Sequence, residues 1–282
     1  MQKGGSVASN VNVLGQVAAF PGRLMRTARV VIRRLAAAPA RNRPPAWTDR
    51  MTVLAVLAWT GVVLIHPFDA VVVRAVGHSL LPPLVVLRDI TNVGKSFAYL
   101  MAAFSVALIV SLVEWNRLGR RGRARLALIY SQSVFAFGAI ALSGVMANIL
   151  KLLVGRARPK LLAVYGPDYR EALHAGYDFA SFPSGHSTTL GAIAAVLTLW
   201  FPRWRLPIWA VALVLAFSRC AADAHYPSDV WGGFCFGFLF TLFLARLLAR
   251  RGAGFRFSHA RLLPQLRYAA PSNGKNGMGK VA

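Results

Sequence analysis

Three residues that can do chemistry lie within a short polar stretch between two long apolar runs: Arg219, His225 and Asp229. A charge in hydrocarbon costs on the order of 2.5–3.5 kcal/mol, so this stretch is expected at a water-facing helix end. Asp229, four residues after His225, can orient one ring nitrogen of the histidine and leave the other free to attack. A nucleophilic histidine beside a guanidinium favours phosphoryl chemistry, although a solvated interfacial loop explains the same three residues when they are taken alone.

A second cluster could hold an anion. Lys151 and Arg158 are seven residues apart, and Pro159 follows, which predicts a helix end. The two cations share a helix face if the helix continues, and otherwise Arg158 folds back over the helix end. Either geometry makes a two-point clamp for an anion.

Residues 183–186 form a third cluster, which is expected to open a helix. Ser184 is a good N-cap, and the amides that follow it, beginning with that of Gly185, form an anion site of their own. A capped helix explains Ser184 and Gly185 but leaves His186 unexplained. His186 is therefore a candidate for chemistry.

The composition places these clusters in a membrane protein. Of the 282 residues, 56% are apolar and 15% are charged, which is not typical of a soluble domain. A net charge of +24 would fit a nucleic-acid-binding protein, but here the basic residues fall between apolar runs of membrane-spanning length. We therefore expect no nucleic-acid partner. The two cysteines, Cys220 and Cys235, have neither the spacing of a zinc site nor that of a disulfide framework.

Six apolar segments predict an all-α, polytopic membrane protein with six transmembrane helices. They cover residues 51–66, 97–115, 126–154, 186–201, 206–220 and 229–248. Of the 33 Lys and Arg residues, 24 fall on one side of this alternation, and the positive-inside rule places that side, with both termini, in the cytoplasm. The three clusters then lie at the outer, periplasmic ends of helices three to six in a cytoplasmic (inner) membrane. Gly233 and Gly237 in the last segment predict close helix packing.

Residues 51–250 are thus predicted to form the membrane domain, flanked by two basic cytoplasmic tails. In residues 1–50, apolar positions at helical spacing between residues 24 and 35 indicate an amphipathic helix on anionic lipid, with a disordered basic tail as the alternative. Residues 251–282 are basic and Gly-rich near their end, and we expect them to be disordered.

Together the three clusters resemble the motifs of the type-2 phosphatidic acid phosphatase superfamily, the integral-membrane lipid phosphate phosphatases. The matching patterns are Lys, six residues, Arg-Pro; Pro-Ser-Gly-His; and Ser-Arg, five residues, His, three residues, Asp. The resemblance implies that His225 attacks phosphorus to give a phosphohistidine while Asp229 holds its ring, and that His186 protonates the leaving oxygen and then activates water. It also implies that no metal or other cofactor is required. The groups implied to bind phosphate are Lys151, Arg158, Ser184, Gly185 and Arg219.

The expected function is hydrolysis of a phosphate or diphosphate monoester of a lipid, with the lipid phosphate and membrane lipids as partners. The resemblance brings in isoprenoid diphosphates such as undecaprenyl diphosphate, lipid A phosphates, phosphatidylglycerol phosphate and phosphatidate. The first two are favoured because Arg156, Lys160 and Arg170 are spare cations for a second phosphate. For Arg156, Lys160, Tyr226 and Asp223, which lie off the motif positions, a substrate rim and a solvated loop both stay open. A lipid phosphotransferase using the same histidine is an alternative. A non-enzymatic transporter is a remote alternative, because the spans carry their ionisable groups at their ends.

Overall fold

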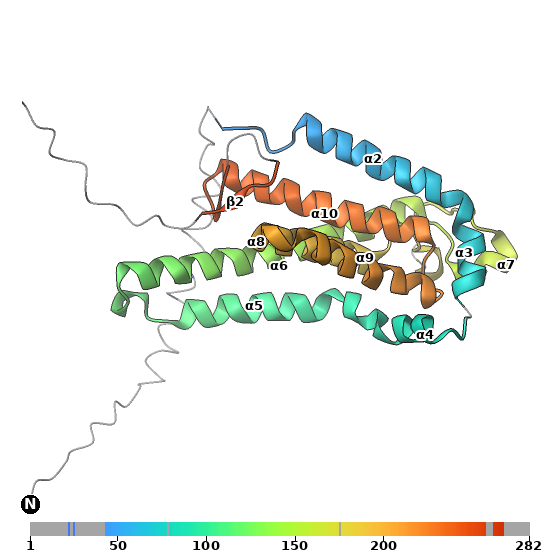
Figure 1. The fold of residues 1–282 in the computed structure, drawn as a ribbon, viewed down its shortest axis with the longest axis horizontal. Helices are drawn as coiled ribbons and strands as arrows, with labels where there is room; N and C mark the ends of the chain where they lie inside the picture. The colour runs from blue at the N-terminus through green and yellow to red at the C-terminus, as the bar shows by residue number, and fades with distance from the viewer. Residues whose placement is uncertain are drawn as a thin grey trace, which may run out of the picture.

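The computed structural model describes residues 22, 25, 43–77, 79–174, 176–257 and 262–267, which are mostly helical (Figure 1). Each of the six predicted segments forms a helix. The helices are α2 (Asp49–Ile65), α5 (Ser96–Leu112), α6 (Arg120–Val154), α8 (Gly185–Trp200), α9 (Arg205–Ala221) and α10 (Pro227–Arg250). The prediction of a helical fold is confirmed. The amphipathic segment predicted between residues 24 and 35 lies outside the described residues, apart from Met25.

Four helical segments among the described residues are long and apolar enough to cross a membrane. They are Asp49–Val76, Arg120–Val154, Pro202–Ala221 and Pro227–Arg250. A fifth candidate, Pro82–Gly94 with Ser96–Leu112, qualifies only as a pair bent by 43°. The remaining helix, α8, has 16 residues, fewer than the ~20 that a lipid-facing span needs. Length and composition therefore give four or five candidates where the sequence predicted six spans.

Helix α8 lies inside the bundle, where it contacts α6, α9 and α10, and most of its residues are buried. Glycines of α10 make this packing close. Gly233 faces the backbone of Ser184 and Gly237 faces that of Thr188, so that a Cβ at either glycine would clash with a carbonyl oxygen. The close packing predicted from this Gly-x-x-x-Gly pair is confirmed.

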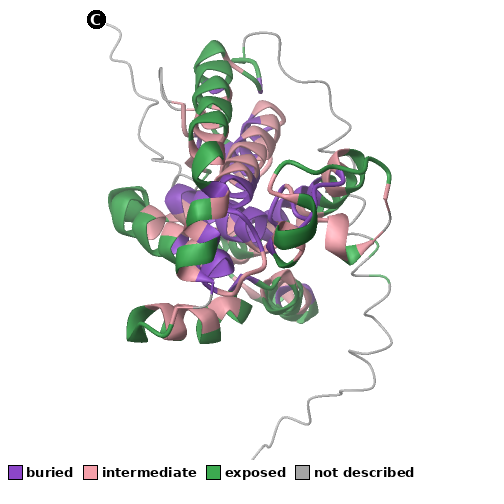
Figure 2. Cartoon of the chain, turned by 90° about the vertical axis from the view of Figure 1, so that its right-hand side faces the viewer, coloured by how far each residue is buried: buried purple, intermediate pink, exposed green. Residues whose placement is uncertain are grey.

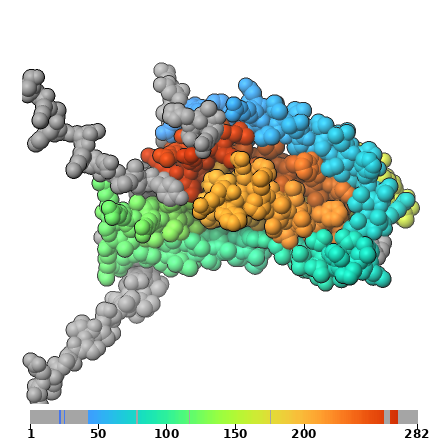
Figure 3. All heavy atoms as spheres, viewed as in Figure 1, coloured from blue at the N-terminus to red at the C-terminus, as the bar shows by residue number. Residues whose placement is uncertain are grey.

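Two long connections fold over one end of the bundle, at the right of Figure 1. The first contains the 3-10 helix η1 (His66–Phe68), α3 (Asp69–Val76), α4 (Pro82–Asp89) and the 3-10 helix η2 (Ile90–Gly94), and the second contains α7 (Leu162–Tyr165). Figure 3 shows α3 and α4 covering this end on the face toward the viewer. Figure 2 looks onto the same end and shows buried residues at its centre with exposed ones around them.

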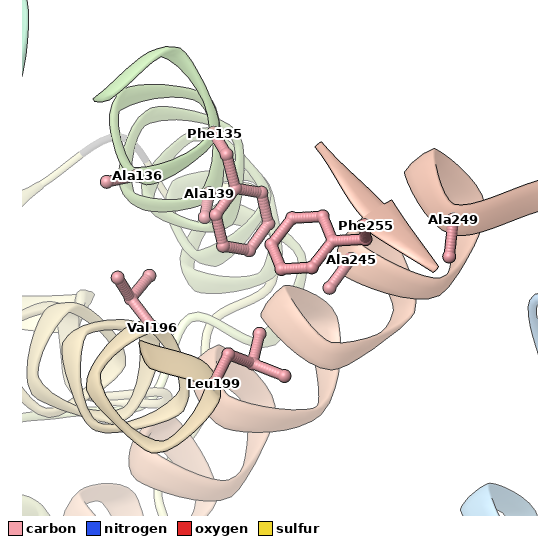
Figure 4. Close-up of a cluster of buried hydrophobic side chains, with 8 residues drawn as sticks. All are labelled: Phe135, Ala136, Ala139, Val196, Leu199, Ala245, Ala249 and Phe255. Carbon is pink, nitrogen blue, oxygen red and sulfur yellow. The ribbon is translucent and has the colours of Figure 1, made fainter. Parts of the chain in front are cut away.

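At the opposite end, a buried apolar cluster joins α6, α8 and α10 to the chain that follows α10 (Figure 4). Its members are Phe135, Ala136, Ala139, Val196, Leu199, Ala245, Ala249 and Phe255. Phe255 belongs to β1 (Phe255–Arg256), which pairs antiparallel with β2 (Gln265–Leu266). Its ring meets the ring of Phe135 edge-on, with 4.7 Å between centroids. The expectation that residues 251–282 are disordered therefore does not hold for this hairpin, because a buried aromatic ring fixes it to the bundle. Residues 268–282 lie outside the described residues.

Candidate active site

The motif residues lie at one end of the bundle because consecutive helices run in opposite directions. Lys151 is in the last turn of α6, and His186 is in the first turn of α8. Arg219 is in the last turn of α9, Asp229 is in the first turn of α10, and His225 lies in the short connection between these helices. The structure thus brings the three sequence clusters together, beneath the two connections that cover this end.

His225 and Asp229 form the buried centre of the site. They are 2% and 0% exposed, and Nδ1 of His225 lies 3.8 Å from Oδ2 of Asp229. This distance is too long for a hydrogen bond, so the carboxylate and the ring are close without being hydrogen-bonded. Two other donors hold the same oxygen: the Ser181 hydroxyl at 2.6 Å and the backbone amide of Tyr226 at 3.1 Å. Asp229 therefore faces the ring of His225 from a fixed position.

The protonation state of His225 follows from this burial. Burial lowers the pKa of His225 to about 3; Asp229 opposes this shift, and the positive charges of Lys151 and Arg158 contribute to it. The imidazole is therefore neutral near pH 7. A neutral imidazole has a lone pair on one ring nitrogen, which is what a nucleophile requires.

Lys151 and Arg158 converge on one carbonyl oxygen, that of Ala180. Nζ of Lys151 donates to it at 2.5 Å and Nη2 of Arg158 donates to it at 3.3 Å. Arg158 also donates to the carbonyl of Tyr177 at 2.8 Å, and its guanidinium lies 3.8 Å from the centroid of the Tyr177 ring. Two cations that share one oxygen acceptor can also share the oxygens of a phosphate.

Arg158 folds back toward Lys151 because α6 ends early. Gly155 adopts a left-handed conformation with φ of +56° and ends the helix at Val154, before Pro159, where the end was expected. The backbone of Glu171 packs where a Cβ would stand, so this position requires glycine. Of the two geometries that the spacing of the cations left open, the structure shows the second.

Ser184 caps α8, as predicted. Its Oγ accepts a first-turn amide at 3.4 Å, and its own amide donates to the carbonyl of Asp229 at 3.1 Å, which ties the start of α8 to the start of α10. Gly185 lies against the side chain of Lys151. Nε2 of His186 is buried and has no hydrogen-bond partner. His186 thus has an unused polar atom that can exchange a proton with a bound group.

Arg219 reaches from α9 toward the connection between α2 and α5. Its Nη1 donates to Oγ1 of Thr91 in η2 at 2.8 Å, whereas its Nε is buried with no hydrogen-bond partner. An unpaired buried donor costs about 1–3 kcal/mol, so this atom is suited to an anion that enters the site. Thr91 was not singled out from the sequence.

Residues 132–253, which include every motif residue, match the family model of the PAP2 superfamily. Over these residues the chain is similar to the PAP2 superfamily. The chain is 41% identical over 139 residues to a lipid A 1-phosphatase of Rhizobium johnstonii. It is 40% identical over 138 residues to a lipid A 1-phosphatase of Rhizobium etli. Each match covers 49% of this chain. It spans 57% and 60% of the length of these two relatives. A solved structure, the transmembrane PAP2 type phosphatidylglycerolphosphate phosphatase from Bacillus subtilis, is similar with a TM-score of 0.48 and 20% identity, over 70% of this chain and 94% of that one.

Besides the PAP2 motifs, the site contains buried charges that the sequence did not reveal. Arg156 was assigned to a substrate rim or a solvated loop, but it is 2% exposed. Its Nη1 lies 2.6 Å from Oδ1 of Asp229, and its Nη2 lies 2.8 Å from Oδ2 of Asp69. Because two carboxylates neutralise it, Arg156 is not a spare cation for a second phosphate. Asp69 belongs to α3, outside the residues that match the PAP2 superfamily.

The other residues close to the PAP2 motifs differ in their surroundings. Lys160 is exposed and forms an ion pair with Asp178, as a solvated loop predicts. Tyr226 is buried beneath the guanidinium of Arg156, and Asp223 occupies a turn with φ of +50°. The case for a second phosphate is weaker as a result.

Within the described residues, no group of three or more His, Cys, Asp or Glu side chains forms a candidate metal site.

Proposed function

We propose that the chain is a membrane lipid phosphatase that removes the 1-phosphate of lipid A through a phosphohistidine on His225. The observation that carries the proposal is the neutral, buried His225 beside the fixed carboxylate of Asp229. The names of the two relatives favour a lipid A phosphate among the four lipid substrates considered above.

The geometry suggests which atoms act in the first step. Since Nδ1 of His225 faces Asp229, Nε2 is the atom that attacks phosphorus, and the P–O bond to the lipid breaks as the N–P bond forms. His186 has to be protonated for this step, and the proton that it takes up as the phosphate enters passes to the leaving oxygen. Asp229 stabilises the positive charge that the ring of His225 acquires.

The second step returns the enzyme to its starting state. A water molecule attacks the phosphohistidine, His186 takes the proton of that water, and the N–P bond breaks to release inorganic phosphate. In both steps Lys151, Arg158 and Arg219 stabilise the charge on the phosphate oxygens. Ser184 also contributes, because its hydroxyl accepts hydrogen bonds from the amide and hydroxyl of Ser187 and keeps its own hydrogen for an anion.

An apolar groove beside the site supports a lipid substrate. It has a volume of about 550 Å³ and runs between α8 and α9. Leu190, one turn after His186, and Leu215, one turn before Arg219, line the end of the groove near the site, and Phe201 and Trp204 line the other end. Apolar surface next to an anion site fits a substrate that has both acyl chains and a phosphate.

We further propose that the site faces the periplasm and that all six helices of residues 51–250 cross the inner membrane, with both termini in the cytoplasm. The distribution of Lys and Arg supports this orientation. The burial of α8 supports a sixth crossing, because a helix surrounded by protein need not match the thickness of the lipid by itself.

The test is release of inorganic phosphate from lipid A 1-phosphate by purified protein in detergent. We expect the wild-type chain to release phosphate and His225→Ala to lose turnover by up to about 10⁶-fold, as when one member of a catalytic unit is removed. His174→Ala is a matched control, because His174 lies on an exposed loop where it pairs with Glu171; it should keep normal turnover.

Two outcomes would contradict different parts of the proposal. Turnover retained in His225→Ala would refute the histidine mechanism. Phosphate release from phosphatidate, phosphatidylglycerol phosphate or undecaprenyl diphosphate, but not from lipid A 1-phosphate, would refute the proposed substrate. It would not contradict the histidine mechanism.

A further inference from the structure

Two carboxylates share one guanidinium beside the proposed nucleophile. Asp69 and Asp229 are both 0% exposed, and Arg156 lies between them. Nη1 of Arg156 is 2.6 Å from Oδ1 of Asp229, and Nη2 is 2.8 Å from Oδ2 of Asp69. These three residues come from α3, from the connection between α6 and α8, and from α10. Three distant segments therefore meet at one buried array of charges.

Every donor group of Arg156 is used inside the protein. Nη1 also donates to the Ser228 hydroxyl at 2.8 Å, and Nε and Nη2 donate to the carbonyl of Pro167 at 3.1 and 2.9 Å. The guanidinium lies 4.3 Å from the centroid of the Tyr226 ring. With its donors occupied and its side chain buried, Arg156 acts on Asp229 rather than on a substrate.

Asp69 holds this array to the start of α10. Its Oδ1 accepts the amide of Ser228 at 2.9 Å, and its Oδ2 accepts the Ser228 hydroxyl at 2.5 Å. A carboxylate is favourable at this place because the first amides of a helix have no partner inside the helix. Asp229 is the residue after Ser228, so Asp69 fixes the turn that presents Asp229 to His225.

Asp69 also affects how much negative charge His225 experiences. Together Asp69, Arg156 and Asp229 carry a net charge of −1, and Asp229 is 3.8 Å from the ring that becomes positive during the reaction. Without Asp69, the charge of Arg156 would cancel that of Asp229, and the array would no longer favour a positive ring.

We propose that Asp69 and Arg156 are positioning residues of the phosphatase, which fix Asp229 and preserve its negative charge, so that α3 is part of the catalytic unit. The inference rests on the function proposed above. It extends the site beyond the residues that match the PAP2 superfamily.

The experiment compares kcat and KM for phosphate release by wild type, Asp69→Asn, Arg156→Lys and Glu171→Gln. Asp69→Asn keeps the shape of the side chain and removes its charge, so we expect kcat to fall about 10- to 100-fold, as when outer partners of a functional ligand are removed, with KM nearly unchanged. Arg156→Lys should lower kcat by a similar factor, because one ammonium cannot bridge both carboxylates. Glu171→Gln is the control: its carboxylate contacts Nδ1 of His174 at 3.1 Å but is 48% exposed, and kcat should be unchanged.

A double-mutant cycle separates positioning from general stability. In a protein that already carries Asp229→Asn, adding Asp69→Asn should lower kcat less than about twofold. The reason is that the carboxylate of Asp229, which Asp69 positions, is already absent. If Asp69→Asn does not fold, Ser228→Ala tests the same array without leaving a charge unpaired, and it should lower kcat with KM unchanged.

Wild-type kcat in folded Asp69→Asn or Ser228→Ala, or full additivity with Asp229→Asn, would overturn the inference. Different outcomes would refute the proposed function: no phosphate release by the wild-type chain, or phosphate release that persists in His225→Ala.

Discussion

At the scale of single residues, a histidine that attacks phosphorus has to be neutral when the substrate arrives. Burial lowers the pKa of His225 to about 3, against about 6.5 for an exposed histidine. At pH 5 an exposed histidine is mostly protonated, whereas His225 is expected to stay neutral. Because its folded-state pKa is lowered, the neutral form of His225 persists well below pH 6.5 and is lost only as the pH falls toward 3.

This protonation state can be measured directly by ¹⁵N NMR of protein labelled in its histidine rings. We expect a neutral-ring signal at pH 5 that disappears in His225→Ala. His174→Ala serves as the control, because it should leave that signal in place. A protonated His225 ring at pH 5 would show that the site admits more water than its 2% exposure indicates.

At the scale of helices, the position of His186 relative to Asp229 depends on how closely α8 approaches α10. A Cβ at Gly237 would clash with the carbonyl oxygen of Thr188 in α8. We expect Gly237→Ala to lower the free energy of unfolding by about 1–3 kcal/mol, the usual cost of overpacking, and to reduce turnover by displacing the two helix starts. Thermal unfolding in detergent and phosphate release measure the two effects.

The same substitution in α6 is the control, because nothing lies within 4 Å of a Cβ built at Gly144. Gly144→Ala should leave turnover unchanged and stabilise the protein by roughly 0.5–1 kcal/mol, since alanine loses less backbone entropy than glycine in a helix. If both variants behave alike, close packing of α8 on α10 does not set the geometry of the site.

At the scale of the whole molecule, the sequence predicted the parts of the site that lie at helix ends. Apolar runs show where helices end, and Lys151, His186, Arg219 and Asp229 each lie within about a turn of such an end. The alternation of the helices then brings these residues together without any knowledge of side-chain contacts.

Contacts between distant segments could not be predicted in this way. Asp69 and Arg156 are 87 residues apart, and from the sequence each looks like a charge in a solvated loop. Neither apolar periodicity nor motif spacing reports on a pairing of this kind. The hairpin around Phe255 was missed for a similar reason, because strands of two residues are too short to leave a period-2 pattern.

The orientation of the whole molecule decides which leaflet supplies the substrate, and it rests on where the basic residues lie. We expect Val164→Cys, in exposed α7 at the site end, to react with a membrane-impermeant maleimide in intact spheroplasts. Gly119→Cys, at the opposite end among the arginines before α6, should react only after the membrane is opened, because the positive-inside rule keeps that end in the cytoplasm. Both variants belong in a chain whose Cys220 and Cys235 have been replaced by alanine, so that only the new thiol reacts. Labelling of Gly119→Cys in intact spheroplasts, with Val164→Cys unlabelled, would mean that the site faces the cytoplasm. Its substrates would then have to be lipids of the inner leaflet.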